Sequence, residues 1–101
     1  SNNVNGIIMS DEIRELFNTI QDRKANPNPD SYTNQLFDDG EDEIVKKIGE
    51  EAIEVILATK GQGDKRLIEE TADLVYHILV LLAVRDLTWD DVLLELNLRR
   101  R

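Results

Sequence analysis

The sequence has no cysteine, only two prolines and few aromatic residues. Without cysteine the chain can form neither disulfides nor thiolate metal sites, and we expect it to act in a reducing cytoplasm. No apolar run approaches the roughly 20 residues that cross a bilayer, so we expect no membrane partner. The first segment, "SNNVNGIIMS", also lacks the basic start and the long apolar core of a signal peptide.

Positive charge is also scarce. The 101 residues include 12 Lys and Arg against 21 Asp and Glu, which gives a net charge of −9 and a pI near 4.5. Such a chain has no general affinity for nucleic acid, because phosphate is anionic too, but its carboxylates can hold a divalent cation. Its length suits one domain, which we place at residues 10–101, after a flexible N-terminal extension of residues 1–9.

Apolar residues recur at helical spacing along most of the chain, and no segment has the pattern of a strand. Pro27 and Pro29 must end the first helix, because proline lacks an amide donor. Asp64 can cap the helix that is predicted from Lys65, and Thr88 with Asp91 forms a capping-box pattern at the start of the last helix. The predicted helices run from a Ser10 cap to the "ANPNPD" segment, from a Ser31 cap through "SYTNQLFDDG", from Glu41 to Lys60, from Lys65 to about Arg85, and from Thr88 toward the final "RRR".

These patterns predict an all-α fold. The two longest helices are joined by "GQGD" and are expected to pair as an antiparallel hairpin. The second half of the later one, "LVYHILVLLAV", is apolar on every face, which is typical of a helix buried on all sides. Since so short a chain cannot easily surround that helix with its own neighbours, we expect a helical bundle that a partner subunit completes.

Three glutamates lie close together in "KKIGEEAIEV". At 100° per residue the apolar stripe of this helix is centred near Ile48, with Glu51 at its edge, Glu54 just beyond and Glu50 roughly opposite. We therefore expect Glu51 and Glu54 to face a helix interface, and Glu50 to face solvent or to orient a neighbouring acid.

On the following helix, Glu70, Asp73 and His77 are three and four residues apart and so share one face. Acids that converge from both helices would raise one another's pKa values unless a cation lay between them. Magnesium prefers such oxygen ligands and keeps several waters, so the pattern predicts a Mg2+ site that can neutralise a polyphosphate.

Each of these residues also has a simpler explanation. A single helical glutamate is most often solvated or ion-paired, and a lone histidine such as His77 is more often a satisfied core residue than a ligand. The paired arrangement favours the metal site, and we place His77 beside Asp73 as an orienting residue. Lys47 projects near Glu51 and Glu54 and is the candidate to bind a substrate phosphate.

The order EExxE then ExxD, formed by Glu50, Glu51, Glu54, Glu70 and Asp73, resembles the all-α nucleotide pyrophosphohydrolase superfamily of the MazG proteins and dimeric dUTPases. Within it, three segments resemble the phosphoribosyl-ATP pyrophosphohydrolases of histidine biosynthesis. They are "SYTNQLFDDG", "KKIGEEAIEVILA" and "EETADLVYHILVLLA". The resemblance covers roughly residues 13–98.

This resemblance implies a homodimer that hydrolyses the bond between the α and β phosphates of phosphoribosyl-ATP with Mg2+. It also implies the roles of the acids, which are carried over position by position. Glu51, Glu54, Glu70 and Asp73 would be metal ligands, Glu50, Glu51 and Glu54 catalytic acids, and Lys47 a phosphate contact.

Two other functions fit the same residues. The metal site could serve standard or damaged nucleoside triphosphates, as in the MazG-like enzymes. Alternatively, the chain could be a non-catalytic acidic helical dimer that acts only as an interaction module, in which case magnesium would not change its stability.

Overall fold

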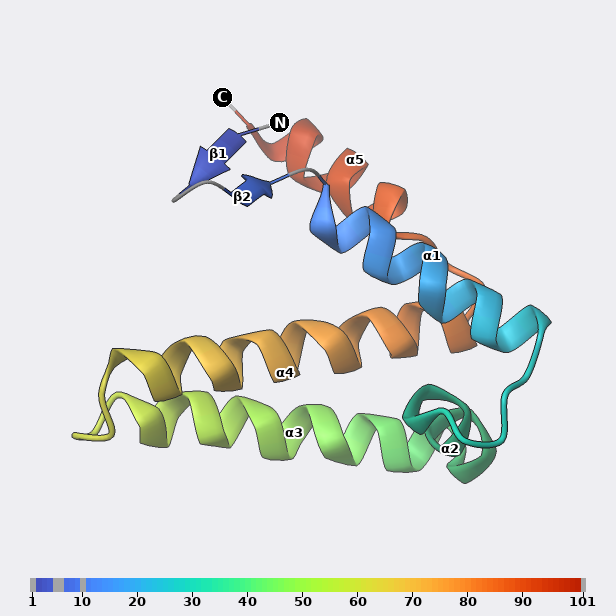
Figure 1. Cartoon of the computed structure of the whole chain (residues 1–101), viewed down its shortest axis with the longest axis horizontal. Helices are drawn as coiled ribbons and strands as arrows, with labels where there is room; N and C mark the ends of the chain where they lie inside the picture. Colours follow the sequence, from blue (N-terminus) through green and yellow to red (C-terminus); the bar gives the residue numbers. More distant parts are fainter. Residues whose placement is uncertain (1, 5–6, 10, 101) are drawn as a thin grey trace.

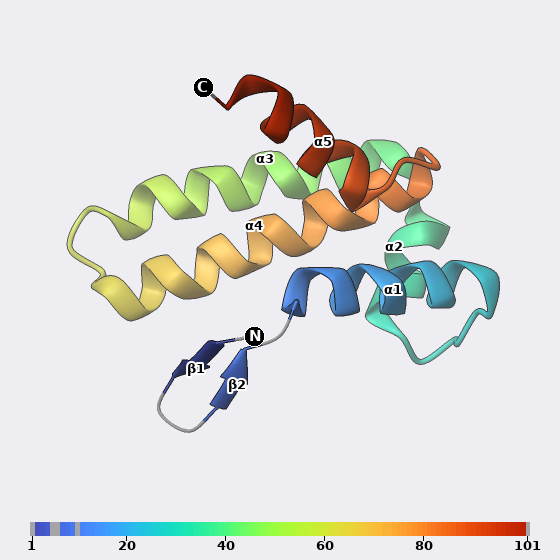
Figure 2. The same cartoon turned by 90° about the horizontal axis from the view of Figure 1, so that it is seen from above.

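The computed structural model describes residues 2–4, 7–9 and 11–100, and these are mainly helical (Figure 1). The described part contains the strands β1 (Asn2–Val4) and β2 (Ile7–Met9) and the helices α1 (Glu12–Ala25), α2 (Tyr32–Asp39), α3 (Glu41–Ala58), α4 (Asp64–Val84) and α5 (Trp89–Arg99). The predicted all-α class is therefore confirmed for the body of the domain. In both views α3 and α4 run side by side in opposite directions, with α1 and α2 beside the end where α3 begins (Figures 1 and 2).

The prediction that the chain contains no strand is wrong at the N-terminus. β1 and β2 pair antiparallel, with Asn2 opposite Met9 and Val4 opposite Ile7. The sequence signal is the Asn5-Gly6 dipeptide between two apolar-containing runs, which favours a tight hairpin. This pattern has no helical periodicity. The flexibility of residues 1–9 stays a prediction, and an isolated two-stranded hairpin of this size is only marginally stable.

Two of the predicted helix caps are confirmed. The Ser31 hydroxyl accepts a hydrogen bond from the backbone N–H of Asn34 at the start of α2. At the start of α5, the Thr88 hydroxyl accepts from the N–H of Asp91, and the Asp91 carboxylate accepts from the N–H of Thr88. Both ends of this capping box are satisfied, as the sequence predicts.

Two other caps differ from the prediction. The cap of α1 is Asp11, whose carboxylate accepts from the N–H of Arg14 at 3.1 Å, while Ser10 lies outside the described residues. Asp64 is the first residue of α4 and not its cap. Gly63 takes the cap position with φ of +91°, a conformation that a side chain disfavours. α3 ends at Ala58, two residues before the predicted Lys60.

The core lies around the second half of α4. Leu79 and Val80 are fully buried there, and Ile44 from the start of α3 packs with them. The buried core cluster is Phe17, Ile20, Leu36, Ile44, Leu79, Val80 and Ala83. Four helices therefore meet at one end of the α3–α4 pair, which leaves the other end of the pair free of this core.

Helix α5 contributes little to this core. No side chain within its described range, residues 89–99, is buried, although Trp89 packs against the core cluster from a half-buried position. Arg14 of α1 holds α5 through two hydrogen bonds to the Asp90 carboxylate, at 2.7 and 3.0 Å. Both of these side chains are solvent-exposed, so the pair positions α5 more than it stabilises the fold. Among the described residues, no helix combines the length and apolar character that a bilayer crossing requires.

The proline-containing connection between α1 and α2 is fixed by one buried amide. Asn34 is 7% exposed, and its side chain donates to the carbonyl oxygen of Arg23 at 2.8 Å. The same side chain accepts from the backbone N–H of Asn28, also at 2.8 Å. Asn34 thus ties the end of α1 and the connecting loop to α2.

We expect Asn34→Ala to lower the free energy of unfolding by about 1–3 kcal/mol, because it leaves two backbone groups without their partner. Urea unfolding followed by circular dichroism measures this change. Gln35→Ala, at the exposed neighbouring position, is the matched control and should change stability little. Equal unfolding midpoints for the two variants would show that Asn34 does not anchor the loop.

Candidate metal centre

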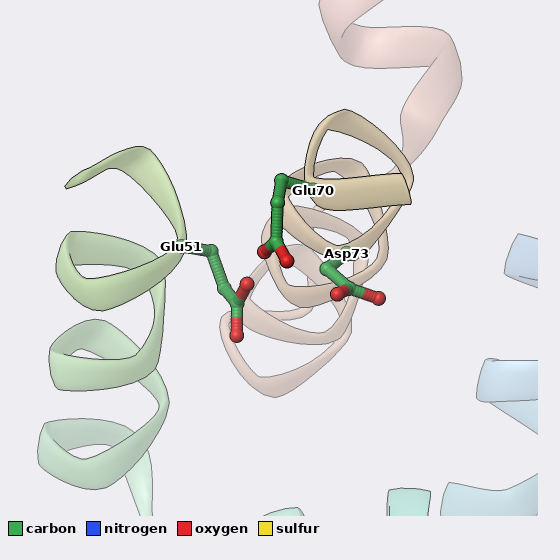
Figure 3. A group of neighbouring side chains, drawn as sticks. All are labelled: Glu51, Glu70 and Asp73. Carbon is green, nitrogen blue, oxygen red and sulfur yellow. The ribbon is translucent and has the colours of Figure 1, made fainter. Parts of the chain in front are cut away.

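Helices α3 and α4 bring three carboxylates together. Glu51 extends from α3 toward α4, from which Glu70 and Asp73 project (Figure 3). One carboxylate oxygen of each residue lies within 4.8 Å of those of the other two. A single cation with oxygen ligands can be reached by all three side chains at this spacing.

Local helix geometry explains the cluster. Glu70 and Asp73 are three residues apart and therefore lie on the same face of α4, one above the other. Glu51 lies on the face of α3 that α4 covers. The short connection between the two helices includes Gly61 and Gly63, both with φ above +90°, which lets the chain reverse within a few residues.

The three acids differ in their exposure to solvent. Glu70 is only 4% exposed, Glu51 is half-buried and Asp73 is exposed. Arg66 pairs with the buried member, since its Nη2 atom lies 2.8 Å from Oε1 of Glu70. Arg66 is not among the predicted site residues, although its place four residues before Glu70 on one helix is a recognisable signal for such a pair.

The environment of Glu51 disfavours its charged form. Burial raises the pKa of the Glu51 carboxyl, and a hydrogen bond with Glu70 and the negative charge of Asp73 raise it further. A hydrogen bond between two carboxyl groups requires a proton on one of them. A divalent cation in place of that proton would bind the same oxygens and remove the repulsion, so these residues fit a metal ion.

The other predicted site residues on α3 surround this cluster. A hollow of about 420 Å³ is lined by Lys47, Glu50, Glu51, Glu54, Arg66, Glu70 and Asp73. Lys47 and Glu54 are half-buried and Glu50 is exposed. Glu54 is not within the tight three-acid group, although it lies only three residues beyond Glu51 on α3. The structure thus brings the predicted residues to one hollow, but it separates Glu54 from the three convergent acids.

His77 lies just outside the hollow. It is buried, and its Nδ1 atom lies 2.7 Å from the backbone carbonyl oxygen of Asp73, not from the Asp73 carboxylate. Since a carbonyl can only accept, Nδ1 carries the proton, and in the neutral ring Nε2 accepts from the Tyr32 hydroxyl at 3.3 Å. Both ring nitrogens are satisfied, and the ring links α2 to the turn of α4 that carries Asp73.

A second hollow, of about 440 Å³, lies at the opposite end of α4. It is lined by Gln21, Lys24, Ala25, Ala83, Asp86, Leu87 and Thr88. Lys24 already donates to the carbonyl of Ala83 and to the Asp86 carboxylate, at 2.8 and 2.7 Å. With one carboxylate against five, this hollow is the poorer candidate for a cation site.

Comparisons with known proteins agree with the geometry. A family model described as phosphoribosyl-ATP pyrophosphohydrolase matches residues 13–100. A protein of Pelotomaculum thermopropionicum, named phosphoribosyl-ATP pyrophosphatase, is 54% identical over 91 residues, which are 90% of this chain and 93% of that protein. A Bacillus cereus protein of the same name is 47% identical over 90% of this chain and 85% of its own length. The family match includes every residue that lines the α3–α4 hollow.

We expect Glu51→Gln to stabilise the metal-free protein at neutral pH. The pKa of Glu51 is raised above its ordinary value of 4.5 in the folded chain, so the folded chain binds more protons than the unfolded chain above pH 4.5. Stability therefore falls as pH rises through the folded pKa, and a neutral glutamine avoids this loss. Melting temperatures in EDTA, measured from pH 4.5 to 8, should separate the variant from the wild type increasingly toward high pH.

Glu15→Gln is the control for this comparison, because Glu15 is an exposed glutamate on α1, away from the hollow. It should show no comparable pH-dependent gain. A Glu51→Gln variant that melts below the wild type at pH 8 would contradict the assigned repulsion.

Proposed function

The chain belongs to the phosphoribosyl-ATP pyrophosphohydrolase family, and on that basis we propose that it hydrolyses the α–β phosphoanhydride of phosphoribosyl-ATP in a Mg2+-dependent reaction. The products are phosphoribosyl-AMP and pyrophosphate, and the reaction is the second step of histidine biosynthesis. The observation that carries the proposal is the convergence of Glu51, Glu70 and Asp73 from two facing helices. We also assign the enzyme to the cytoplasm, in keeping with a chain that has no cysteine.

In this proposal Glu51, Glu70 and Asp73 hold the metal, and Glu54 completes the set from the next turn of α3. Magnesium takes oxygen ligands in an octahedral arrangement and keeps waters, which suits a hollow that is lined by carboxylates and open to solvent. When bound, the metal neutralises phosphate charge and lowers the pKa of a bound water.

The protein groups around this centre have separate tasks. Lys47 is half-buried on the same face of α3 as Glu51 and pairs with a phosphate oxygen of the substrate. Glu50 lines the hollow outside the proposed ligand set, so its carboxylate is available to accept the proton of the attacking water. His77 holds the turn of α4 that carries Asp73, through the hydrogen bond from its Nδ1 atom to the backbone carbonyl oxygen of Asp73.

We also propose that the bundle is completed by a second copy of the chain. Large aliphatic side chains are exposed on three helices, namely Val45, Ile53, Ile56 and Leu57 on α3, Ile68 on α4, and Leu93, Leu94, Leu96 and Leu98 on α5. Ile56 is 59% exposed and Leu98 is 71% exposed. An apolar surface spread over three helices is costly to leave in water, and a homodimer would cover it.

Pyrophosphate release from phosphoribosyl-ATP tests the activity. We expect release only when Mg2+ is present, and a loss of at least about 100-fold in Asp73→Ala, because a lost ligand costs more than a lost outer partner of a ligand. Glu54→Ala should also lose activity, whereas Glu15→Ala should keep it. Full activity in both site variants would exclude the proposed centre.

The same assay with a panel of nucleoside triphosphates tests the substrate. Phosphoribosyl-ATP should be the preferred substrate by kcat/KM. Faster turnover of a standard or damaged triphosphate would instead favour a nucleotide-cleansing enzyme with the same metal centre.

The oligomeric state tests the proposed dimer. Sedimentation equilibrium should give the mass of two chains for the wild type, and Ile56→Asp should weaken association at least about tenfold by placing a charge on the covered face. Gln35→Asp adds the same charge at an exposed position of α2 and should leave the dimer intact. A monomeric wild type at micromolar concentration would exclude the dimer.

A further inference from the structure

Arg66 occupies a position that the proposed reaction does not yet use. It lies near the start of α4 and lines the same hollow as the carboxylates and Lys47. Its side chain is 50% exposed, whereas the side chain of its partner, Glu70, is 5% exposed. The solvated end of the pair is therefore the cation, and the buried end is the candidate metal ligand.

The ion pair compensates the charge of the buried Glu70 when no metal is bound. A buried carboxylate is unfavourable unless a cation or a proton compensates its charge. Arg66 provides that compensation for Glu70 at 2.8 Å. The buried acid of the convergent group thus has a substitute for a metal ion.

A divalent cation bound to Glu70 changes this balance. The guanidinium and the metal ion would then share one carboxylate at short distance, and like charges repel. Because Arg66 is half-exposed on a long side chain, it can turn away from Glu70 at little cost. Its planar fork of N–H donors matches two phosphate oxygens better than a lysine ammonium does.

We propose that Arg66 is the counter-ion of Glu70 in the metal-free enzyme, and that metal binding releases it to bind the pyrophosphate portion of the substrate. Arg66 on α4 and Lys47 on α3 then approach the phosphates from the two walls of the hollow. This inference rests on the proposed function, since it requires the Mg2+ site and a phosphate-bearing substrate. Arg66 then has opposite effects on two ligands: it weakens the binding of Mg2+ and strengthens the binding of pyrophosphate.

Calorimetric titrations of Arg66→Gln with Mg2+ alone, and with pyrophosphate at saturating Mg2+, test both effects. We expect the variant to bind Mg2+ about two- to tenfold more tightly, in proportion to the loss of the half-exposed pair with Glu70; the pair with the exposed Glu69, at 3.8 Å, contributes little. It should bind pyrophosphate at least about threefold more weakly. Arg99→Gln is the control, because Arg99 also pairs with a glutamate four residues earlier, the exposed Glu95 on α5, outside the hollow. It should change neither affinity.

The outcomes separate this inference from the proposed function. Wild-type protein that binds Mg2+, with unchanged or weaker Mg2+ binding in Arg66→Gln, would overturn the role of Arg66 alone and reduce the pair to a stabilising contact. Wild-type protein that binds no Mg2+ would overturn the metal site and this inference together. Arg66→Lys keeps the charge and so the fold. It should bind Mg2+ as the wild type does but pyrophosphate about threefold more weakly, and equal pyrophosphate binding would overturn the role of the guanidinium fork.

Discussion

Repulsion among Glu51, Glu70 and Asp73 is the constraint that the rest of the molecule must accommodate. Three carboxylates within 4.8 Å of one another oppose the pairing of α3 with α4, which is the most extensive helix–helix contact in the described part of the chain. Arg66 pairs with Glu70, and the pKa of Glu51 is raised by burial and by its acidic neighbours. Local repulsion of this kind is typical of functional sites, which supports the proposed metal centre.

The apolar core stabilises the fold against the repulsion among these carboxylates. Ile44, Leu79 and Val80 lock the start of α3 against the second half of α4, and residues of α1 and α2 close the cluster. The carboxylates lie on the other half of the same two helices, where no such cluster is needed. The hydrogen bonds of His77 to Tyr32 and to the Asp73 backbone connect the two halves, so the packed end of the bundle orients the charged end.

The outer surface leaves large apolar side chains exposed to solvent. Core residues hold α1 to α4 in place, whereas α5 is joined to α1 mainly by an exposed ion pair and leaves its leucines in solvent. A single chain therefore satisfies its core without covering its remaining apolar side chains. That imbalance supports the proposed dimer, in which a second copy of the chain would cover these side chains.

The sequence by itself determined the helical class, the caps at Ser31 and Thr88, and the shared face of Glu70 and Asp73, because helical periodicity and side-chain capping act over a few residues. It could not place the Asp11 cap one residue beyond Ser10, and its helical signals did not include the Asn5-Gly6 hairpin pattern. Only the tertiary structure decided that Glu51 joins Glu70 and Asp73 while Glu54 stands apart, and that Arg66 pairs with the buried Glu70. The reason is that periodicity fixes which residues share one helix face, whereas the stagger and rotation of α3 against α4 fix which residues of the two faces meet.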